Sequence, residues 1–144
     1  MKYISTRGNK QSVDSAEAII AGLADDGGLF VPTEMPLIDK GFIERLIEAS
    51  YEERALRVLQ LFLTDYTDEE IKNCIGHAYG KKKFDTEKIA PVENFPADES
   101  VLELWHGPTS AFKDMALQLL PQLMSTALVK TGEKSQIIIL VATS

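Results

Sequence analysis

The first eighty residues alternate polar stretches with segments in which apolar residues recur at every third or fourth position, as in amphipathic helices. Three of these segments open with a Ser, Thr or Asp that is followed three positions later by Glu, the capping-box signature of a helix start. Glycines after the first and third segments mark where these helices should end. The three predicted boxes are Asp14 with Glu17, Ser50 with Glu53, and Thr67 with Glu70, and the two glycines are Gly22 and Gly80.

Short strands and one further helix complete this part of the chain. Residues 3–6 read as an edge strand, with a turn at residues 7–9. Residues 29–31 read as a second strand that Pro32 closes. Residues 42–47 carry apolar side chains at helical spacing. We therefore predict a mostly helical N-terminal region with little sheet.

The pattern changes beyond residue 85 to strand, helix and strand. Residues 101–105 predict a strand, residues 109–130 a long helix kinked at Pro121, and residues 137–141 a strand that is apolar on both faces. These three elements form one βαβ unit, whose crossover should be right-handed and whose two strands should be parallel. A parallel sheet needs more strands than two, so we expect a fragment of a larger architecture.

The predicted fold class is therefore α/β, with α+β character in the N-terminal part. We place a boundary near residue 85, where a polar stretch and two prolines interrupt the pattern. Residues 1–85 form a small, mostly helical domain on this prediction. Residues 86–144 form the first part of an α/β domain with a parallel sheet.

Composition narrows the class of protein. The 144 residues are 44% hydrophobic and carry a formal charge of −7, with a sequence pI near 4.8. Nucleic-acid binding rests on clustered Lys and Arg, so this balance argues against a nucleic-acid partner, and the basic run 81–83 reads as a solvated connector. No apolar run reaches membrane-spanning length, and one cysteine excludes an internal disulfide. We expect a cytoplasmic protein without a membrane partner.

One lysine stands where it could act as a nucleophile. Residues 106–114 follow a predicted strand and open the long helix, with Thr109 or Ser110 as the expected N-cap, so Lys113 should lie in the first helical turn. The positive end of the helix dipole and partial burial beside Phe112 both favour a neutral amine, which is able to form a Schiff base. A solvated surface lysine is the alternative interpretation, and periodicity does not decide between them.

The topology suggests what this lysine would face. Parallel strands of a βαβ unit bring their carboxyl ends to one edge of the sheet, where ligands bind in open α/β folds. Lys113 and the pair Thr143 and Ser144 should therefore meet at one crevice. A phosphate-binding P-loop does not fit, because Ala111-Phe112 stands where a second glycine must precede the lysine, and Asp114 stands where Ser or Thr must follow it. His77, His106 and Cys74 offer too few ligands at metal spacing, so no metal site is predicted.

Two segments in the right order carry a family resemblance. Residues 102–114, LELWHGPTSAFKD, resemble the segment that carries the pyridoxal-phosphate lysine in threonine synthases. Residues 22–32, GLADDGGLFVP, together with YISTRG at residues 3–8, look like the N-terminal region of the same family. The resemblance extends over nearly the whole chain but only over the first part of a family member.

The resemblance implies a fold type II pyridoxal-phosphate lyase, similar to the tryptophan synthase β family. Such an enzyme converts O-phosphohomoserine and water to threonine and phosphate, in threonine biosynthesis. Lys113 matches the lysine that holds the cofactor and moves protons, and Phe112 is expected to wall the cofactor site. Thr143 and Ser144 match the start of a loop that binds the substrate carboxylate. The segments that grip the cofactor phosphate in the family have no counterpart here, so we expect the 144 residues alone to be inactive.

Other functions remain open at this point. A related dehydratase or lyase would keep the cofactor and change the substrate. A non-catalytic interaction module is the alternative from a different class of protein. An unpaired sheet edge would also permit association into an oligomer. Arg7 could hold a phosphate but reads more simply as a surface side chain in a turn, and it is not assigned to the site.

Overall fold

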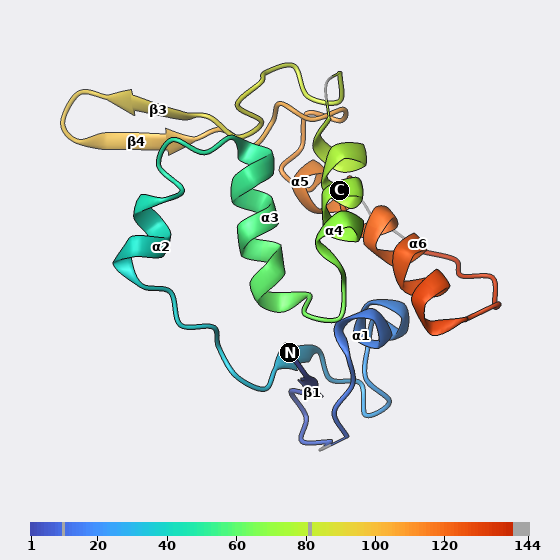
Figure 1. The fold of residues 1–144 in the computed structure, drawn as a ribbon. Helices are drawn as coiled ribbons and strands as arrows, with labels where there is room; N and C mark the ends of the chain where they lie inside the picture. The colour runs from blue at the N-terminus through green and yellow to red at the C-terminus, as the bar shows by residue number, and fades with distance from the viewer. Residues whose placement is uncertain (10, 81, 140–144) are drawn as a thin grey trace.

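The computed structural model describes residues 1–9, 11–80 and 82–139 (Figure 1). Helices dominate, and the strands within these ranges form two separate two-stranded sheets. In chain order the elements are β1 (Tyr3–Ser5), α1 (Ser15–Ala21), β2 (Phe30–Pro32), α2 (Lys40–Glu44), α3 (Tyr51–Phe62), α4 (Asp68–Tyr79), β3 (Val92–Phe95), β4 (Glu99–Leu102), α5 (Asp114–Leu117) and α6 (Leu120–Thr131).

The N-terminal elements follow their sequence signals. The three predicted capping boxes form at the starts of α1, α3 and α4, and Gly22 and Gly80 end α1 and α4. Gly22 has a φ of 69°, which is left-handed backbone that glycine adopts without a steric penalty. β1 pairs antiparallel with β2, with Ser5 opposite Phe30. The prediction of a mostly helical region with a minor sheet is confirmed.

The core lies where α4 packs against α3 and α6, and α6 also packs against α1. Its largest group of side chains comes from one face of α4, which repeats at the predicted spacing. Lys130 of α6 forms an ion pair with Glu70 of α4 at 3.0 Å. The Tyr66 hydroxyl, in the connection before α4, donates to the carbonyl of Leu123 in α6 at 3.0 Å. The buried side chains of α4 and α6 are Ile71, Cys74, Ile75, Ala78, Tyr79, Leu123 and Ala127.

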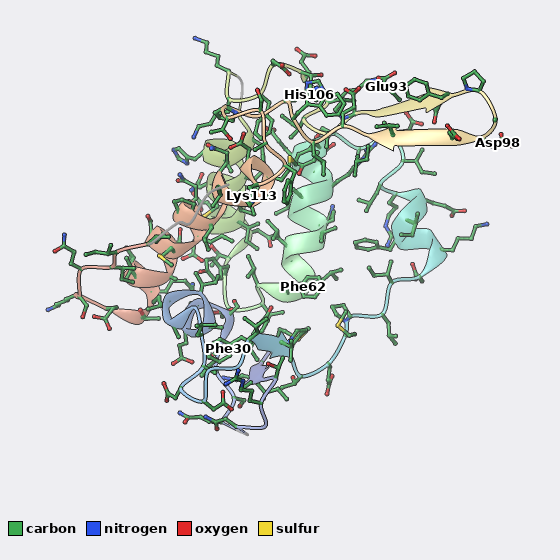
Figure 2. All side chains as sticks on the ribbon, turned by 180° about the vertical axis from the view of Figure 1, so that it is seen from behind. Phe30, Phe62, Glu93, Asp98, His106 and Lys113 are labelled. Carbon is green, nitrogen blue, oxygen red and sulfur yellow. The ribbon has the colours of Figure 1, made fainter. Side chains whose placement is uncertain are left out.

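The second sheet is a hairpin that projects from one end of the helices (Figure 1). β3 and β4 pair antiparallel, with Phe95 opposite Glu99, and every residue of both strands is exposed. Ala97 and Asp98 in the turn have φ values of 70° and 59°, the left-handed backbone that a tight hairpin requires. Figure 2 shows Asp98 at the far end of the hairpin and His106 near its base.

The predicted βαβ unit is wrong for the residues that the structure describes. The strand expected at 101–105 instead ends at Leu102 and pairs with its neighbour in sequence, because a short hairpin closes at a smaller entropic cost than a parallel crossover. Residues 137–139 lie outside any strand, and residues 140 and 141 are outside the described ranges. No parallel pairing occurs in these ranges, so the α/β part of the predicted fold class is not seen.

The long helix predicted at residues 109–130 is also corrected. It consists of α5 and α6, which are separated by a turn at residues 118–119. Residues 109–113 are not helical. Pro121 occupies the first turn of α6, where its missing N–H is tolerated, so the expected kink is a complete break. Across the described segments, no helix has the length and apolar character needed to cross a bilayer.

Candidate functional site

The segment between β4 and α5 carries the candidate lysine. Lys113 lies one residue before α5, as its N-cap, with right-handed backbone at φ −62°. The expected N-caps Thr109 and Ser110 are wrong, since both lie in a turn, and Ser110 has a φ of 55°. The Lys113 Nζ lies 4.4 Å from the centre of the Phe112 ring, within cation–π range. Phe112 itself is 62% exposed.

An open groove of about 810 Å³ adjoins these two side chains. Its walls come from α3, from the hairpin and from α5, and most of its lining is apolar. Arg54 is the other cation in the lining, and its guanidinium already donates to the carbonyls of Leu46 and Ile47 at 2.8 and 2.6 Å. The lining residues are Tyr51, Arg54, Ala55, Val58, Ala90, Val92, Leu102, Leu104, Phe112, Lys113, Met115, Ala116 and Leu117.

Asp114 closes the turn that carries Lys113. Its side chain is buried, and its Oδ2 accepts from the backbone N–H of Thr109 at 2.8 Å and from the Thr109 hydroxyl at 3.0 Å. Gly107 lies directly against this carboxylate, because a Cβ at Gly107 would come within 2.6 Å of the Asp114 Oδ2. The segment from Gly107 to Asp114 therefore folds back on itself around one buried carboxylate.

A helix of the core fastens α5 from the other side. The Tyr79 hydroxyl, at the end of α4, donates to the carbonyl of Met115 at 2.6 Å. The Tyr79 ring packs edge-on against Tyr51 at 5.0 Å, and burial raises the pKa of its hydroxyl above the ordinary value. A protonated hydroxyl is what this contact requires, so the lysine segment is tied to the hydrophobic core.

His106 stands between two carboxylates at the base of the hairpin (Figure 2). Its Nε2 lies 2.7 Å from Glu103 and its Nδ1 lies 2.5 Å from Asp85, and its ring stacks on Trp105. The hydrogen bonds to Glu103 and then to Asp85 raise the pKa of His106 above its ordinary value. The His106 ring thus links the connector after α4 to the segment that leads to Lys113.

The remaining predicted residues lie elsewhere. Thr143 and Ser144 fall outside the described residues, so their approach to Lys113 stays a prediction. The Arg7 guanidinium donates to the carbonyl of Asp26 at 3.3 Å, within the turn next to the first sheet. Cys74 is buried in the core, with its sulfur 3.4 Å from the Thr126 hydroxyl. Within the described part of the chain, no cluster of His, Cys, Asp and Glu offers three metal ligands.

The buried carboxylate of Asp114 and the hydrogen bonds of His106 to Glu103 and Asp85 were not predicted from the sequence. The signal for Asp114 was available, since a glycine and a threonine precede it at positions where a turn can close on an acidic side chain. His106 with Glu103 has the spacing of neighbours in a turn, but its second partner, Asp85, is twenty-one residues away. Such a distant contact leaves no local pattern.

Comparisons with known proteins agree on one family. The family described as threonine synthase N terminus matches residues 2–79. The threonine synthase of Pseudomonas aeruginosa is 41% identical over all of this chain, which covers 30% of that protein. The crystal structure of pyridoxal-phosphate-bound threonine synthase from Brucella melitensis is 42% identical and superimposes with a TM-score of 0.86, over 92% of this chain and 28% of that one. The yeast threonine synthase structure gives 32% identity and a TM-score of 0.82, over 92% and 27%.

This chain therefore spans less than a third of the length of these relatives. The match nevertheless includes both the N-terminal helical region and the segment that carries Lys113, since nearly the whole chain is aligned. More than half of the chain lies within the family match, and the chain belongs to the threonine synthase family, of which it represents the N-terminal region.

Proposed function

We propose that this chain supplies the cofactor lysine of a pyridoxal-phosphate-dependent threonine synthase, which converts O-phosphohomoserine and water to threonine and phosphate. The observation that carries the proposal is the place of Lys113, whose amine borders an apolar groove beside Phe112. The Pseudomonas aeruginosa relative at 41% identity is a threonine synthase, and one solved relative is described with pyridoxal phosphate bound.

The residues at the groove fit one end of this cofactor. An aromatic pyridine ring suits an apolar wall that includes Phe112, and a primary amine at that wall suits an aldehyde. The phosphate needs cationic or N–H donors. Arg54 is the cation on the lining besides Lys113, and its guanidinium is engaged with backbone carbonyls. The phosphate would therefore be held by residues other than the cations of this lining.

Four residues of the chain have roles in this proposal. Lys113 holds the cofactor through its amine and moves protons at that nitrogen, while Phe112 packs against the ring. Thr143 and Ser144 bind the carboxylate of the substrate. When bound, pyridoxal phosphate supplies an electron sink for carbanion chemistry, and the protein orients it and chooses the bond that breaks. The 144 residues alone lack a phosphate grip on this view, so we expect them not to turn over substrate.

The experiment traps the cofactor on the chain. The protein is incubated with pyridoxal phosphate, reduced with borohydride and mapped by mass spectrometry. We expect selective labelling of Lys113 over the highly exposed Lys40, and loss of the dominant label in Lys113→Arg. Uniform labelling of exposed lysines would contradict the proposed role of Lys113 and favour a non-catalytic interaction module. Formation of threonine from O-phosphohomoserine by this chain alone would contradict the expected inactivity.

A further inference from the structure

We propose that Asp114 is a positioning residue, whose buried carboxylate fixes the turn from Gly107 to Lys113 and thereby sets where the Lys113 amine stands at the groove. The inference deepens the proposed function and rests on it where the cofactor is concerned. Asp114 follows the lysine directly, yet the two side chains differ completely in surroundings. Lys113 is exposed at the groove, whereas Asp114 is 1% exposed.

The bonds of Asp114 close a loop rather than a helix. Both donors belong to Thr109, five residues earlier, and both reach the same carboxylate oxygen. The N–H of Ser110 donates to the carbonyl of Gly107 at 3.1 Å, and the N–H of Asp114 donates to that of Ala111 at 3.0 Å. Two successive turns, at residues 107–110 and 111–114, therefore lead from Gly107 past the lysine. The carboxylate of Asp114, at the end of the second turn, binds Thr109 in the first.

Close packing leaves this turn little freedom. A Cβ on Gly107 would lie 2.5 Å from the Cβ of Asp114, so only glycine fits against the carboxylate in this arrangement. The next residue of α5, Met115, is held by the Tyr79 hydroxyl. The turn before Lys113 is thus closed by the bonds between Asp114 and Thr109, and the helix after it is anchored by the bond from Tyr79 to Met115. Because a reacting group misplaced by about 1 Å loses much of its rate, a fixed backbone here would govern how the amine meets an aldehyde.

The test measures how Lys113 reacts when single donors or acceptors are removed. Asp114→Ala deletes the acceptor, and Thr109→Val deletes the hydroxyl donor while it keeps the backbone N–H and the carboxylate. We expect each variant to lower the rate of selective borohydride-trapped labelling of Lys113 by pyridoxal phosphate, by about tenfold for Asp114→Ala and less for Thr109→Val. We also expect faster backbone hydrogen exchange across residues 107–113.

Conservative variants separate positioning from a general loss of structure. Asp114→Asn keeps an oxygen that can accept both bonds, and Thr109→Ser keeps both donors, so both should recover most of the labelling rate. Asp65→Ala is the matched control, because Asp65 likewise accepts from a backbone N–H, that of Ala16 at 3.0 Å, and from a hydroxyl, that of Ser15. It should lower the unfolding midpoint without changing labelling at Lys113.

The outcomes distinguish this inference from the proposed function. If Lys113 is labelled equally in the wild type, Asp114→Ala and Thr109→Val, the positioning role is overturned and the cofactor role stands. If the wild type shows no selective labelling, the cofactor role falls. In that case, faster exchange at residues 107–113 in Asp114→Ala, with an altered rate of Lys113 acetylation by acetic anhydride, still supports the positioning role. Unchanged exchange and acetylation overturn it.

Discussion

The helical core and the lysine-bearing region differ in how far their apolar side chains are exposed to solvent. In the core, where α4 packs against α3 and α6, Ile71 and Ala78 of α4 are 1% and 0% exposed. In the lysine-bearing region, which comprises the hairpin, the groove and α5, large side chains such as Leu102 and Phe112 stay more than half exposed. Burial of apolar surface makes the largest favourable contribution to folding, so the core stabilises the chain and the lysine-bearing region contributes little.

The helices of the core bury their apolar faces against one another, whereas the lysine-bearing region leaves much of its apolar surface open. α4 finds its partners within the described residues, through side chains and through the Tyr66 and Lys130 contacts to neighbouring elements. The lysine-bearing region has an open apolar groove and a hairpin exposed on both faces. Its geometry is maintained by polar contacts, those of Asp114, Tyr79 and His106, rather than by a hydrophobic interior.

Matched truncations in the two regions give the largest expected contrast. Ile71→Ala removes a side chain that is 1% exposed and should lower the free energy of unfolding by about 3 kcal/mol, through lost transfer energy and a residual cavity. Leu102→Ala removes a side chain that is 55% exposed and should cost about 0.5 kcal/mol or less. Urea unfolding followed by circular dichroism measures both. Equal costs would show that the groove is part of the core.

Removal of a helix cap should have a smaller effect. Thr67 caps α4 by accepting from the N–H of Glu70 at 3.2 Å, while the Glu70 carboxylate accepts from the N–H of Thr67 at 2.7 Å. Thr67→Ala should lower the free energy of unfolding by about 1 kcal/mol, because an N–H at the helix start loses its partner. The unfolding midpoint in urea measures the loss. Thr67→Ser keeps the acceptor and should remain close to the wild type, so a large loss in that variant would contradict the capping explanation.

The N-terminal helices of the core could be predicted from the sequence because their signals are local, whereas the packing of Leu123 and Ala127 of α6 into the same core was not predicted. Capping boxes lie within four residues, and the apolar stripe of α4 lies on one helix, so Thr67 and Ile71 reveal their roles in the printed sequence. The hairpin escaped prediction because its turn uses Ala97 and Asp98 in left-handed backbone, without the Asn-Gly or Asp-Gly pair that announces such turns. Its strand was therefore assigned to a parallel partner.

The candidate site was predictable in part. Family resemblance pointed to Lys113, which does lie at a helix start, but as the N-cap of α5 and not inside the first turn of a helix capped by Thr109 or Ser110. The helix boundary was misplaced because Thr109 can serve either as an N-cap or as a donor to a distant carboxylate, and local sequence does not choose between these roles. The structure chooses the second, with Asp114 as acceptor.

The hydrogen bond from Tyr79 to Met115 links the two regions, and its removal should have a similar cost. Tyr79→Phe removes the hydroxyl that donates to the Met115 carbonyl and leaves the Tyr51 packing in place. The free energy of unfolding should fall by about 1 kcal/mol, the net value of one hydrogen bond. Hydrogen exchange should quicken in α5 and in the preceding turn while α4 stays protected. Equal loss of protection in α4 would mean that the two regions unfold as one unit.

The smallest expected effect concerns pH and His106. Because Glu103 and Asp85 raise its folded-state pKa, the protonated ring stabilises the folded chain. That contribution is complete below the unfolded-state pKa of about 6.5 and is lost as the pH rises through the higher folded-state pKa. The difference in urea midpoint between the wild type and His106→Gln should therefore shrink as the pH rises above about 6.5.

Direct titration sharpens this prediction. NMR titration of the His106 ring should give a midpoint above the ordinary histidine value, and Glu103→Gln should bring it back towards that value, since the Glu103 hydrogen bond is the larger cause. Asp85→Asn should act in the same direction but less. If the two variants leave the midpoint unchanged, the carboxylates do not hold the ring. The base of the hairpin is then joined to the connector without them, through the backbone bond from the Asp85 N–H to the His106 carbonyl at 3.0 Å.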